Sequence, residues 1–293
     1  MRISYRIFVS FASVIIVLSL LSVGFAGEKI LVIPKGTKAV FWHKVHAGAV
    51  QAGADLSVNV IVRGPREEDQ YEAQKKIIEW GIRAECDAVV LAPNHVSLVA
   101  PALEKARASG IKIVLIDSKM DASFHACIVE SDNYRAGRQA ADYTAELIRG
   151  SGRVILARHI ENHASTAERG KGFLDGVLIK YPGIEVIADP YIGGSKGLAY
   201  RQISGLLNRF PGTDAIFCVG ETACLGTLKA LRETDKENRI RLVGFDLNSE
   251  IRQALLDNEM DAVLVQDPFQ IGYEGVWSAY RLLRNEFVPK EIY

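Results

Sequence analysis

Asp87-Ala-Val-Val-Leu-Ala-Pro93 follows the same pattern as Asp214-Ala-Ile-Phe-Cys-Val-Gly220: an acidic residue, a continuous apolar run and a turn residue. Continuous apolar runs of this length are typical of strands buried on both faces of a parallel sheet. Each stretch is followed by a helical segment and then by a strand that ends in a carboxylate, Asp117 in the first copy and Asp246 in the second. The sequence therefore predicts the same strand–helix–strand unit in both halves of the chain.

The segments around these two copies also alternate between short β-branched runs and longer stretches with helical periodicity. Strands are predicted over residues 29–34, 57–63, 88–92, 112–117 and 126–129, and helices over 41–54, 67–80 and 97–109. The same alternation continues from residue 153 to residue 266. Strands and helices that alternate with short loops indicate an α/β fold of parallel sheets covered by helices on both faces.

The repeat also predicts where a ligand would bind. Open α/β sheets bind ligands at the carboxyl ends of their strands, which is where Asp117 and Asp246 stand. Two Rossmann-like lobes that face each other would bring these carboxylates into a shared cleft. Because no Gly/Ser/Pro-rich linker separates the halves, we expect short crossovers near residues 131–133 and 266–268 to form a hinge of several strands.

The charge balance argues against some classes of partner. The 293 residues include 35 basic and 35 acidic side chains, and no long run carries one sign of charge. Nucleic acids and anionic membrane surfaces are bound through basic surfaces, so neither is expected as a partner. Hydrophobic residues make up 48% of the chain and charged residues 24%, a balance typical of globular domains with well-formed cores.

The first 26 residues have the features of a secretory signal peptide. Arg2 and Arg6 provide a basic start, and an apolar stretch runs from Ile7 to Phe25. Gly24-Phe25-Ala26 gives the small-x-small pattern that precedes signal cleavage, so cleavage is expected before Gly27. The alternative is an uncleaved anchor, because a stretch of this length can span a bilayer. Both alternatives place the rest of the chain outside the cytoplasmic membrane, in the periplasm.

The cysteine spacing does not resemble a metal site. Cys86 and Cys127 lie at or in predicted strands, so buried free thiols are expected there. Cys218 and Cys224 flank a strand-to-helix turn and could be close in space. Whether they pair stays open at this point.

From about residue 29 to residue 289 the sequence resembles the type I periplasmic binding proteins, specifically the ribose-binding-protein-like group. The resemblance is carried by the order and spacing of several short motifs: Pro34-Lys-Gly-Thr37 with Phe41-Trp42, Leu91-Ala-Pro93, Ile116-Asp-Ser118, Ser131-Asp-Asn133, Ala167-Glu-Arg-Gly-Lys-Gly-Phe173, Val243-Gly-Phe-Asp246 and Val265-Gln-Asp-Pro-Phe-Gln-Ile-Gly272. It implies a two-lobed clamp with a three-stranded hinge. The N-terminal lobe would comprise residues 28–131 and 267–286, and the C-terminal lobe residues 132–266 and 287–293. Relatives of this group usually carry another strand after residue 290, so the last strand is expected to be truncated.

The resemblance also implies a function. A member of this family captures a small sugar or sugar-like ligand in the interlobe cleft and delivers it to an ABC importer, and it acts as a monomer. The alternative is a sensing subunit that presents its closed form to a membrane histidine kinase or a chemoreceptor. The sugar-responsive repressors share the two-lobed core, but they need an N-terminal helix-turn-helix, and here the export signal takes that place.

The candidate ligand-binding residues form a set suited to a sugar. Carboxylates and amides exchange hydrogen bonds with hydroxyl groups, an arginine donates several, and aromatic planes pack against the C–H faces of the ring. The residues that provide these groups at the predicted cleft are Phe41, Trp42, Asp117, Asn133, Arg169, Asp246 and Gln266. Each has a purely structural alternative, such as core packing for the aromatic residues, helix capping for the aspartates and turn formation for Asn133.

Four positions depart from the ribose-binding pattern. Lys35 and Ala39 stand where serine and asparagine contacts are usual, and Ser118 stands where an arginine follows the aspartate. Glu221 takes the place of an asparagine ligand. These departures argue against ribose itself. Lys35 and Glu221 join the candidate site, where Lys35 would serve an acidic sugar or balance a nearby carboxylate.

No sequence pattern indicates an enzyme, a cofactor or a metal site. The first strand is not followed by a GxGxxG turn, so a nucleotide-binding Rossmann enzyme is not expected. The six histidines form no HExxH-like pattern. His159 and His163 lie four residues apart, but Glu161-Asn162 between them interrupts any helix. Ser165 near His163 is a weak candidate for a nucleophile and its base.

Overall fold

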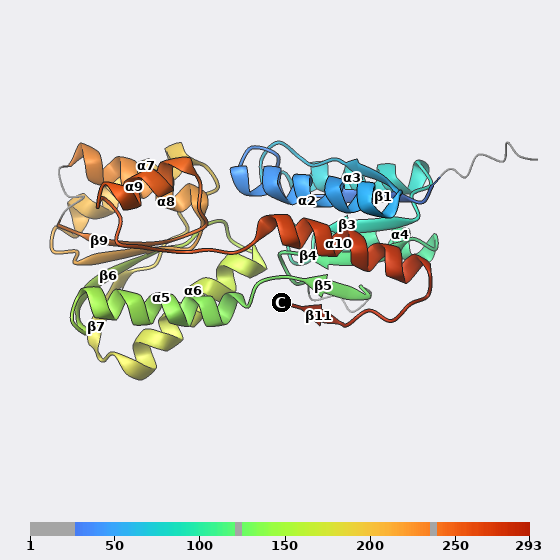
Figure 1. The fold of residues 1–293 in the computed structure, drawn as a ribbon. Helices are drawn as coiled ribbons and strands as arrows, with labels where there is room; N and C mark the ends of the chain where they lie inside the picture. The colour runs from blue at the N-terminus through green and yellow to red at the C-terminus, as the bar shows by residue number, and fades with distance from the viewer. Residues whose placement is uncertain (1–26, 121–124, 235–238) are drawn as a thin grey trace, which may run out of the picture.

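The chain folds into two α/β lobes that lie side by side (Figure 1). The computed structural model describes residues 27–120, 125–234 and 239–293, so the expected export signal at residues 1–26 lies outside the described residues. Within the described ranges, no helix is long and apolar enough to cross a membrane.

The first lobe is built on a six-stranded parallel sheet in the order β2-β1-β3-β4-β5-β11. Its elements are β1 (Lys29–Ile33), α2 (Val40–Leu56), β2 (Asn59–Val62), α3 (Tyr71–Arg83), β3 (Ala88–Leu91), α4 (Ala100–Ala108), β4 (Lys112–Ile116), β5 (Cys127–Val129), α10 (Pro268–Leu283) and β11 (Glu291–Ile292). The second lobe is built on a five-stranded parallel sheet in the order β7-β6-β8-β9-β10. Its elements are α5 (Asn133–Leu147), β6 (Ser151–Ala157), α6 (Ala164–Lys180), β7 (Gly183–Ala188), α7 (Lys196–Arg209), β8 (Ala215–Cys218), α8 (Glu221–Glu233), β9 (Arg241–Phe245), α9 (Ser249–Leu256) and β10 (Ala262–Leu264).

The predicted α/β class is confirmed. The packing of β1 explains the continuous apolar runs from which this class was predicted. Side chains of a strand alternate between the two faces of the sheet. Ile30 and Val32 pack on the face covered by α2 and α10, whereas Leu31 and Ile33 pack on the face covered by α3 and α4. Both faces are therefore buried, which accounts for continuous apolar runs in place of alternating ones.

The predicted repeat is present at the ends of β4 and β9. Asp117 and Asp246 both follow their strand with a positive φ, 63° and 69°, in the left-handed region that aspartate tolerates better than most residues. The Asp117 amide donates to the carbonyl of Val129 at 2.8 Å, and the Asp246 amide donates to the carbonyl of Leu264 at 2.9 Å. The two lobes thus turn the chain in the same way at the carboxyl end of equivalent strands.

Two connections cross between the lobes, residues 130–132 after β5 and residues 265–267 after β10 (Figure 1). The Ser131 hydroxyl donates to Gln266 Oε1 at 2.8 Å, so a hydrogen bond ties the two connections together. The resemblance implied a third hinge strand with residues 287–293 in the C-terminal lobe, and that assignment is wrong. β11 pairs in parallel with β5, and the amides of Ile128 and Glu130 donate to the carbonyls of Lys290 and Ile292. Residues 290–292 therefore form hydrogen bonds with the edge strand β5 of the first sheet.

The four cysteines are buried free thiols. Cys218 Sγ lies 3.2 Å from Thr227 Oγ1, and Cys224 Sγ lies 3.6 Å from the Phe245 carbonyl oxygen. The pairing of Cys218 with Cys224 that the sequence left open is not formed in the structure.

Glycines bring helices into backbone contact in both lobes. A Cβ on Gly48 of α2 would lie 1.9 Å from the carbonyl oxygen of Phe269 in α10. In the second lobe, a Cβ on Gly172 of α6 would lie 2.1 Å from the carbonyl oxygen of Tyr134 in α5. The close approach of α5 and α6 matters for function, because α6 carries residues of the cleft described below.

We predict that Gly172→Ala destabilises the second lobe by about 1–3 kcal/mol, because the added methyl group forces α5 and α6 apart. Gly205→Ala in α7 is the matched control, because no atom lies within 4 Å of its Cβ position. Replacing an unhindered helical glycine by alanine should stabilise by about 0.5–1 kcal/mol. Urea denaturation followed by circular dichroism measures both changes. Equal shifts of the two midpoints would show that the close helix contact is not under steric constraint.

Candidate functional site

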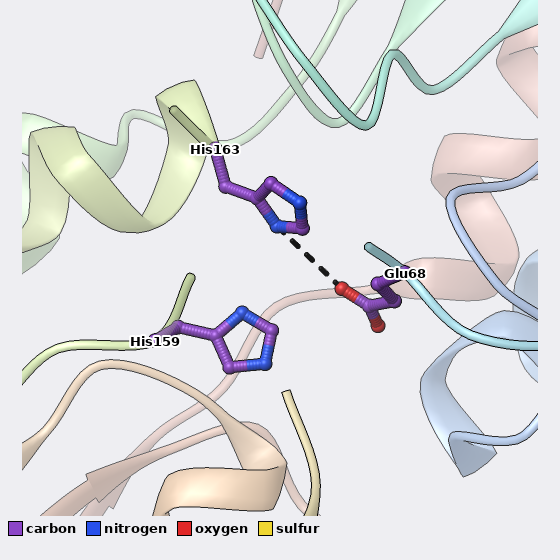
Figure 2. Close-up of side chains that lie close together, drawn as sticks. All are labelled: Glu68, His159 and His163. Atoms are coloured by element: carbon purple, nitrogen blue, oxygen red, sulfur yellow. Dashed lines mark ion pairs between the residues drawn. The ribbon is translucent and has the colours of Figure 1, made fainter. Parts of the chain in front are cut away.

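A cleft lies between the lobes at the carboxyl ends of the strands. The first lobe contributes Lys35, Ala39, Phe41, Trp42, Glu68 and Asp117, the second lobe contributes His159, His163, Ser165, Thr166, Arg169, Gly220, Glu221, Thr222 and Asp246, and the second connection contributes Gln266. The structure therefore brings together eight of the nine residues that the sequence analysis selected. Asn133 is the exception. Figure 2 shows Glu68 facing His159 and His163, three lining residues that were not selected.

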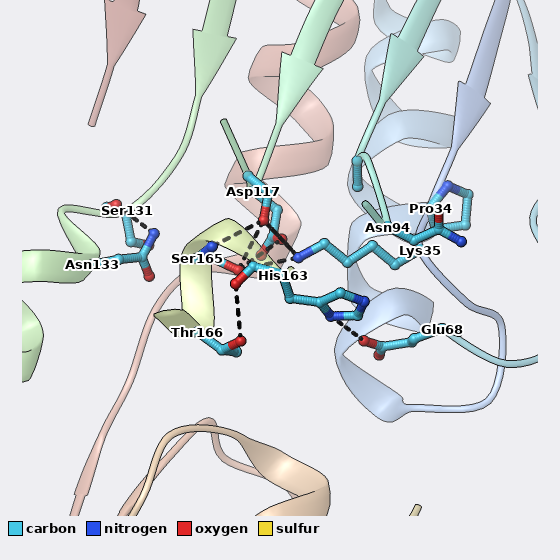
Figure 3. A network of polar contacts seen from close by, with 12 residues as sticks. Pro34, Lys35, Glu68, Asn94, Asp117, Ser131, Asn133, His163, Ser165 and Thr166 are labelled. Atoms are coloured by element: carbon cyan, nitrogen blue, oxygen red, sulfur yellow. Dashed lines mark hydrogen bonds and ion pairs between the residues drawn. The ribbon is translucent and has the colours of Figure 1, made fainter. Parts of the chain in front are cut away.

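Lys35 is buried at the base of the cleft and is bound by its own lobe (Figure 3). Its ammonium group donates to Asp117 Oδ2 at 2.6 Å and to the Ser118 hydroxyl at 2.6 Å. Burial raises the pKa of Asp117, but the charges of Lys35 and Arg169 outweigh this and leave the pKa below its usual value. Of the two roles considered for Lys35, the structure shows the balancing of a carboxylate.

Ser165, at the start of α6, connects this cluster to the second lobe. Its hydroxyl accepts from Lys35 Nζ at 3.1 Å and from the Ser118 hydroxyl at 2.9 Å. Ser118 thus takes part in the interlobe contact in place of the arginine expected from the family pattern. Among the described residues, the hydroxyl of Ser165 bonds to Lys35, Asp117 and Ser118 and not to His163, so the nucleophile–base pair considered from the sequence does not form.

Arg169 is the buried cation of the second lobe. Its guanidinium carbon lies 3.6 Å from the ring centroid of Phe245, and Nη1 donates to the Val219 carbonyl at 2.9 Å. Nη1 also lies 3.7 Å from Asp246 Oδ2. Stacking and a backbone hydrogen bond therefore fix the plane of the guanidinium beside Asp246.

Asp246 is held by the hinge. Gln266 Nε2 donates to Asp246 Oδ1 at 2.7 Å, and Gln266 Oε1 accepts from Ser131 in the other connection. Burial raises the pKa of Asp246 above its usual value, although the positive charge of Arg169 opposes this. Since both hinge connections share this hydrogen-bond chain, the position of the carboxylate depends on the hinge geometry.

Asn133 lies behind the cleft, at the first turn of α5. Its Oδ1 accepts from Arg169 Nε at 2.8 Å, and its Nδ2 donates to the Ser131 carbonyl at 2.9 Å. The amide thus orients Arg169 and ties α5 to the first connection. The sequence analysis selected Asn133 as a candidate ligand contact, but in the structure its amide bonds to Arg169 and it is not among the residues that line the cleft.

Glu221, in the second lobe, contacts the N-terminal end of helix α2 across the cleft. Its Oε2 accepts from the backbone amide of Phe41 at 3.3 Å, and its Oε1 accepts from Asn248 Nδ2 at 3.0 Å. Helix α2 has no acidic residue in its first turn and no side-chain cap of its own. A carboxylate at this end satisfies a free amide and interacts favourably with the helix dipole. Glu221 therefore caps a helix of the opposite lobe.

Phe41 and Trp42 serve the core and the cleft together. Their rings meet edge to face with centroids 4.7 Å apart, and both side chains are buried. Trp42 Nε1 donates to Glu68 Oε1 at 2.7 Å. Both residues therefore pack in the core of the first lobe and also line the cleft.

The sequence analysis did not select Glu68, His159 and His163 as cleft residues, and the local structure shows why. The predicted helix over 67–80 included Glu68, but α3 begins at Tyr71, so Glu68 stands in the loop before it. His159 follows β6 and His163 precedes α6, and Asn162 between them has a φ of 64°. The available signal was the position of both histidines in the short loop that follows a buried strand, rather than their four-residue spacing.

We predict that Lys35→Met destabilises the protein by about 3–5 kcal/mol, because it leaves the Asp117 carboxylate buried beside one cation fewer. Adding Asp117→Asn should restore a large part of this loss, since the charge is then removed as well. Lys38→Met is the control, because Lys38 is half exposed and pairs with Glu67 at the surface, where an ion pair contributes about 0–1 kcal/mol. Urea midpoints of the four proteins test the coupling, which is refuted if the double variant is no more stable than Lys35→Met.

The comparisons with known proteins agree with this geometry. A family model described as a periplasmic binding protein domain matches residues 30–287. The ribose import binding protein of Bacillus subtilis is 26% identical over 219 residues, which cover 75% of this chain and 70% of that protein. The D-allose-binding periplasmic protein of Escherichia coli is 24% identical over 275 residues, covering 91% of this chain and 88% of that protein.

A solved structure shares the fold over nearly the whole chain. The carbohydrate transporter solute binding protein from Agrobacterium radiobacter, in complex with D-arabinose, superposes with a TM-score of 0.88 at 28% identity. The match covers 91% of this chain and 92% of that one. The two-lobed arrangement is therefore shared with a protein whose structure contains a sugar.

Proposed function

Because the chain belongs to the periplasmic binding protein family, we propose that it captures a small sugar or sugar-like molecule between its lobes and delivers it to an ABC importer. The observation that carries this proposal is the buried Arg169–Asp246 pair at the wall of the cleft. The relatives named as ribose and D-allose binding proteins, and the solute binding protein solved in complex with D-arabinose, support it. The protein binds and releases its ligand without transforming it.

The polar groups at the wall suit a hydroxylated ligand. Asp246 Oδ1 is occupied by Gln266, while Oδ2 faces Arg169 at a distance longer than a hydrogen bond. A ligand hydroxyl that donates to Oδ2 and accepts from the guanidinium would complete this pair. Phe41 and Trp42 offer aromatic surface to the C–H face of a sugar ring.

The charges favour a neutral ligand over a sugar acid. The ammonium of Lys35 is already bound to Asp117, so it offers no unpaired positive charge to an anion. The lining holds four carboxyl groups, on Glu68, Asp117, Glu221 and Asp246, against the two cations Lys35 and Arg169. An anionic ligand would find the ammonium of Lys35 already paired and several carboxyl groups beside it, whereas a polyol would only exchange hydrogen bonds with the lining.

The lobe contacts support a clamp that opens and closes. Glu221 meets the amide of Phe41 across the cleft, Lys44 donates to the Leu247 carbonyl at 3.2 Å, and Ser165 meets Lys35 and Ser118. These contacts are few and polar, so opening about the two connections costs little compared with unfolding either lobe. A ligand that binds both lobes shifts this equilibrium towards the closed form that the importer recognises.

Export to the periplasm through the N-terminal signal, and action as a monomer, belong to the same proposal. Import is favoured over the sensor subunit that the sequence left open, because the relatives described above are named as import, transport or binding proteins. Membership in a periplasmic family is consistent with the basic and apolar start of the sequence.

We predict that a neutral pentose, hexose or polyol raises the melting temperature selectively, whereas sugar acids do not. A ligand present at a hundredfold excess over its dissociation constant stabilises the folded state by about 2.7 kcal/mol. A thermal-shift screen followed by titration calorimetry gives the ligand and its affinity. Stabilisation by a sugar acid, with none by neutral sugars, would contradict the charge argument.

The same calorimetry tests the site. Asp246→Asn should weaken binding of the selected sugar by about 10- to 100-fold, because a hydrogen bond to a charged group is lost. Asp257→Asn, at the exposed end of α9 in the same lobe, is the matched control and should bind with unchanged affinity. Equal affinities of Asp246→Asn and the wild type would place the ligand elsewhere.

A further inference from the structure

Three metal-ligating side chains converge inside the cleft from three separate segments. Glu68 comes from the loop before α3, His159 from the loop after β6, and His163 is the residue that precedes α6. One ligand atom from each lies within 4.8 Å of the others (Figure 2). Because Glu68 belongs to the first lobe and the histidines to the second, the cluster spans the opening between the lobes.

The carboxylate of this cluster is oriented by a neighbour. Trp42 Nε1 donates to Glu68 Oε1 at 2.7 Å, which leaves Oε2 facing His163 Nδ1 at 3.7 Å. Hydrogen bonds of this kind, which fix the direction of a ligating group, are characteristic of metal sites.

The two imidazoles are buried with unused nitrogen atoms. His159 is 6% exposed and His163 1%. No described group makes a hydrogen bond to Nδ1 of His159 or to either ring nitrogen of His163. Buried polar atoms without partners are costly and rare, so a missing partner is expected here.

The charge of the lining is compatible with such a partner. The lining has two more carboxyl groups than cations, so a divalent ion would balance its charge when all four are ionised.

We propose that Glu68, His159 and His163 bind one divalent transition-metal ion of the Zn²⁺ class, which joins the two lobes within the cleft. Two nitrogen donors and one carboxylate favour Zn²⁺, Co²⁺ or Ni²⁺ over Ca²⁺ and Mg²⁺, which prefer oxygen ligands. Bond lengths of about 2.0–2.2 Å would draw the ligand atoms to ~3.3–3.5 Å from one another, a small contraction across the lobes. Three protein ligands leave one position of a tetrahedral ion open to the cleft, where a water molecule or a ligand hydroxyl can bind.

This inference goes beyond sugar capture, because the ion needs no sugar in order to bind. It is tested on the full chain, purified without a histidine tag, treated with a chelator and transferred to metal-free buffer. Titration with ZnCl₂ in the absence of sugar should show one ion per chain by calorimetry and by elemental analysis. Co²⁺ should produce visible d–d absorption bands of a low-coordinate site, and excess Mg²⁺ or Ca²⁺ should not displace it.

Variants on both lobes separate a bridging site from incidental binding. Glu68→Gln and His163→Gln should each weaken Zn²⁺ binding by about 100-fold, and Trp42→Phe by about 10-fold through the loss of carboxylate orientation. His46→Gln is the matched control, because His46 is exposed on α2, away from the cleft. Circular dichroism establishes that each variant is folded. If His163→Gln does not fold, Glu68→Gln tests the same ion from the other lobe.

Several outcomes would overturn the proposal. Failure of the folded wild type to retain one Zn²⁺ at micromolar free concentration would remove the site. Wild-type affinity in Glu68→Gln would refute the bridge between lobes, and an equal loss in His46→Gln would indicate binding by surface histidines. Because metal binding is measured without sugar, a negative result leaves the sugar screen unaffected, and a failed sugar screen leaves the metal titration unaffected.

Discussion

The need to pair buried charge within each lobe, at the cleft that the lobes share, constrains the rest of this structure. Lys35 and Asp117 form an ion pair on the first lobe, and Arg169 stands beside Asp246 on the second. A buried charge without a partner is far more costly than a buried pair, so the lobes and the hinge must hold these groups in register. The positive φ of both aspartates, the stacking of Arg169 on Phe245 and the amide of Asn133 all serve this requirement.

The same constraint connects the cleft to the hinge and to the helix packing. Asp246 is hydrogen-bonded to Gln266, which is hydrogen-bonded to Ser131. Both connections therefore belong to one hydrogen-bond chain that ends at the Asp246 carboxylate. Arg169 lies on α6, whose close contact with α5 depends on glycines at the interface. A change in lobe orientation therefore reaches the charged wall of the cleft through short, direct contacts. No long-range pathway is needed to couple ligand capture to closure.

The interlobe contacts are polar and exchangeable, unlike the cores of the lobes. Glu221 caps α2 from the opposite lobe, and Ser165 meets Lys35 and Ser118. Groups of this kind can bond to water or to a ligand when the lobes separate, whereas apolar core residues cannot. The molecule thus combines two apolar lobe cores with a polar interface, as the proposed opening and closing of the clamp requires. An ion held by Glu68, His159 and His163 would favour the closed arrangement at the same place.

The sequence by itself determined the class of fold and the two aspartates of the cleft. A continuous apolar run in the sequence shows that both faces of the strand are buried, which gives the fold class. Ligands bind at the carboxyl ends of parallel strands, which gives the position of the two aspartates. Arg169, Gln266, Phe41 and Trp42, which residue chemistry and family motifs selected as candidate ligand contacts, line the cleft in the structure. Only the tertiary structure decided that Asn133 orients Arg169, that Glu68 faces two histidines and that β11 joins the first sheet. These outcomes depend on contacts between segments that are distant in the chain, such as the loop that contains Glu68 and the loop that contains His159. Local sequence patterns carry no information about such contacts.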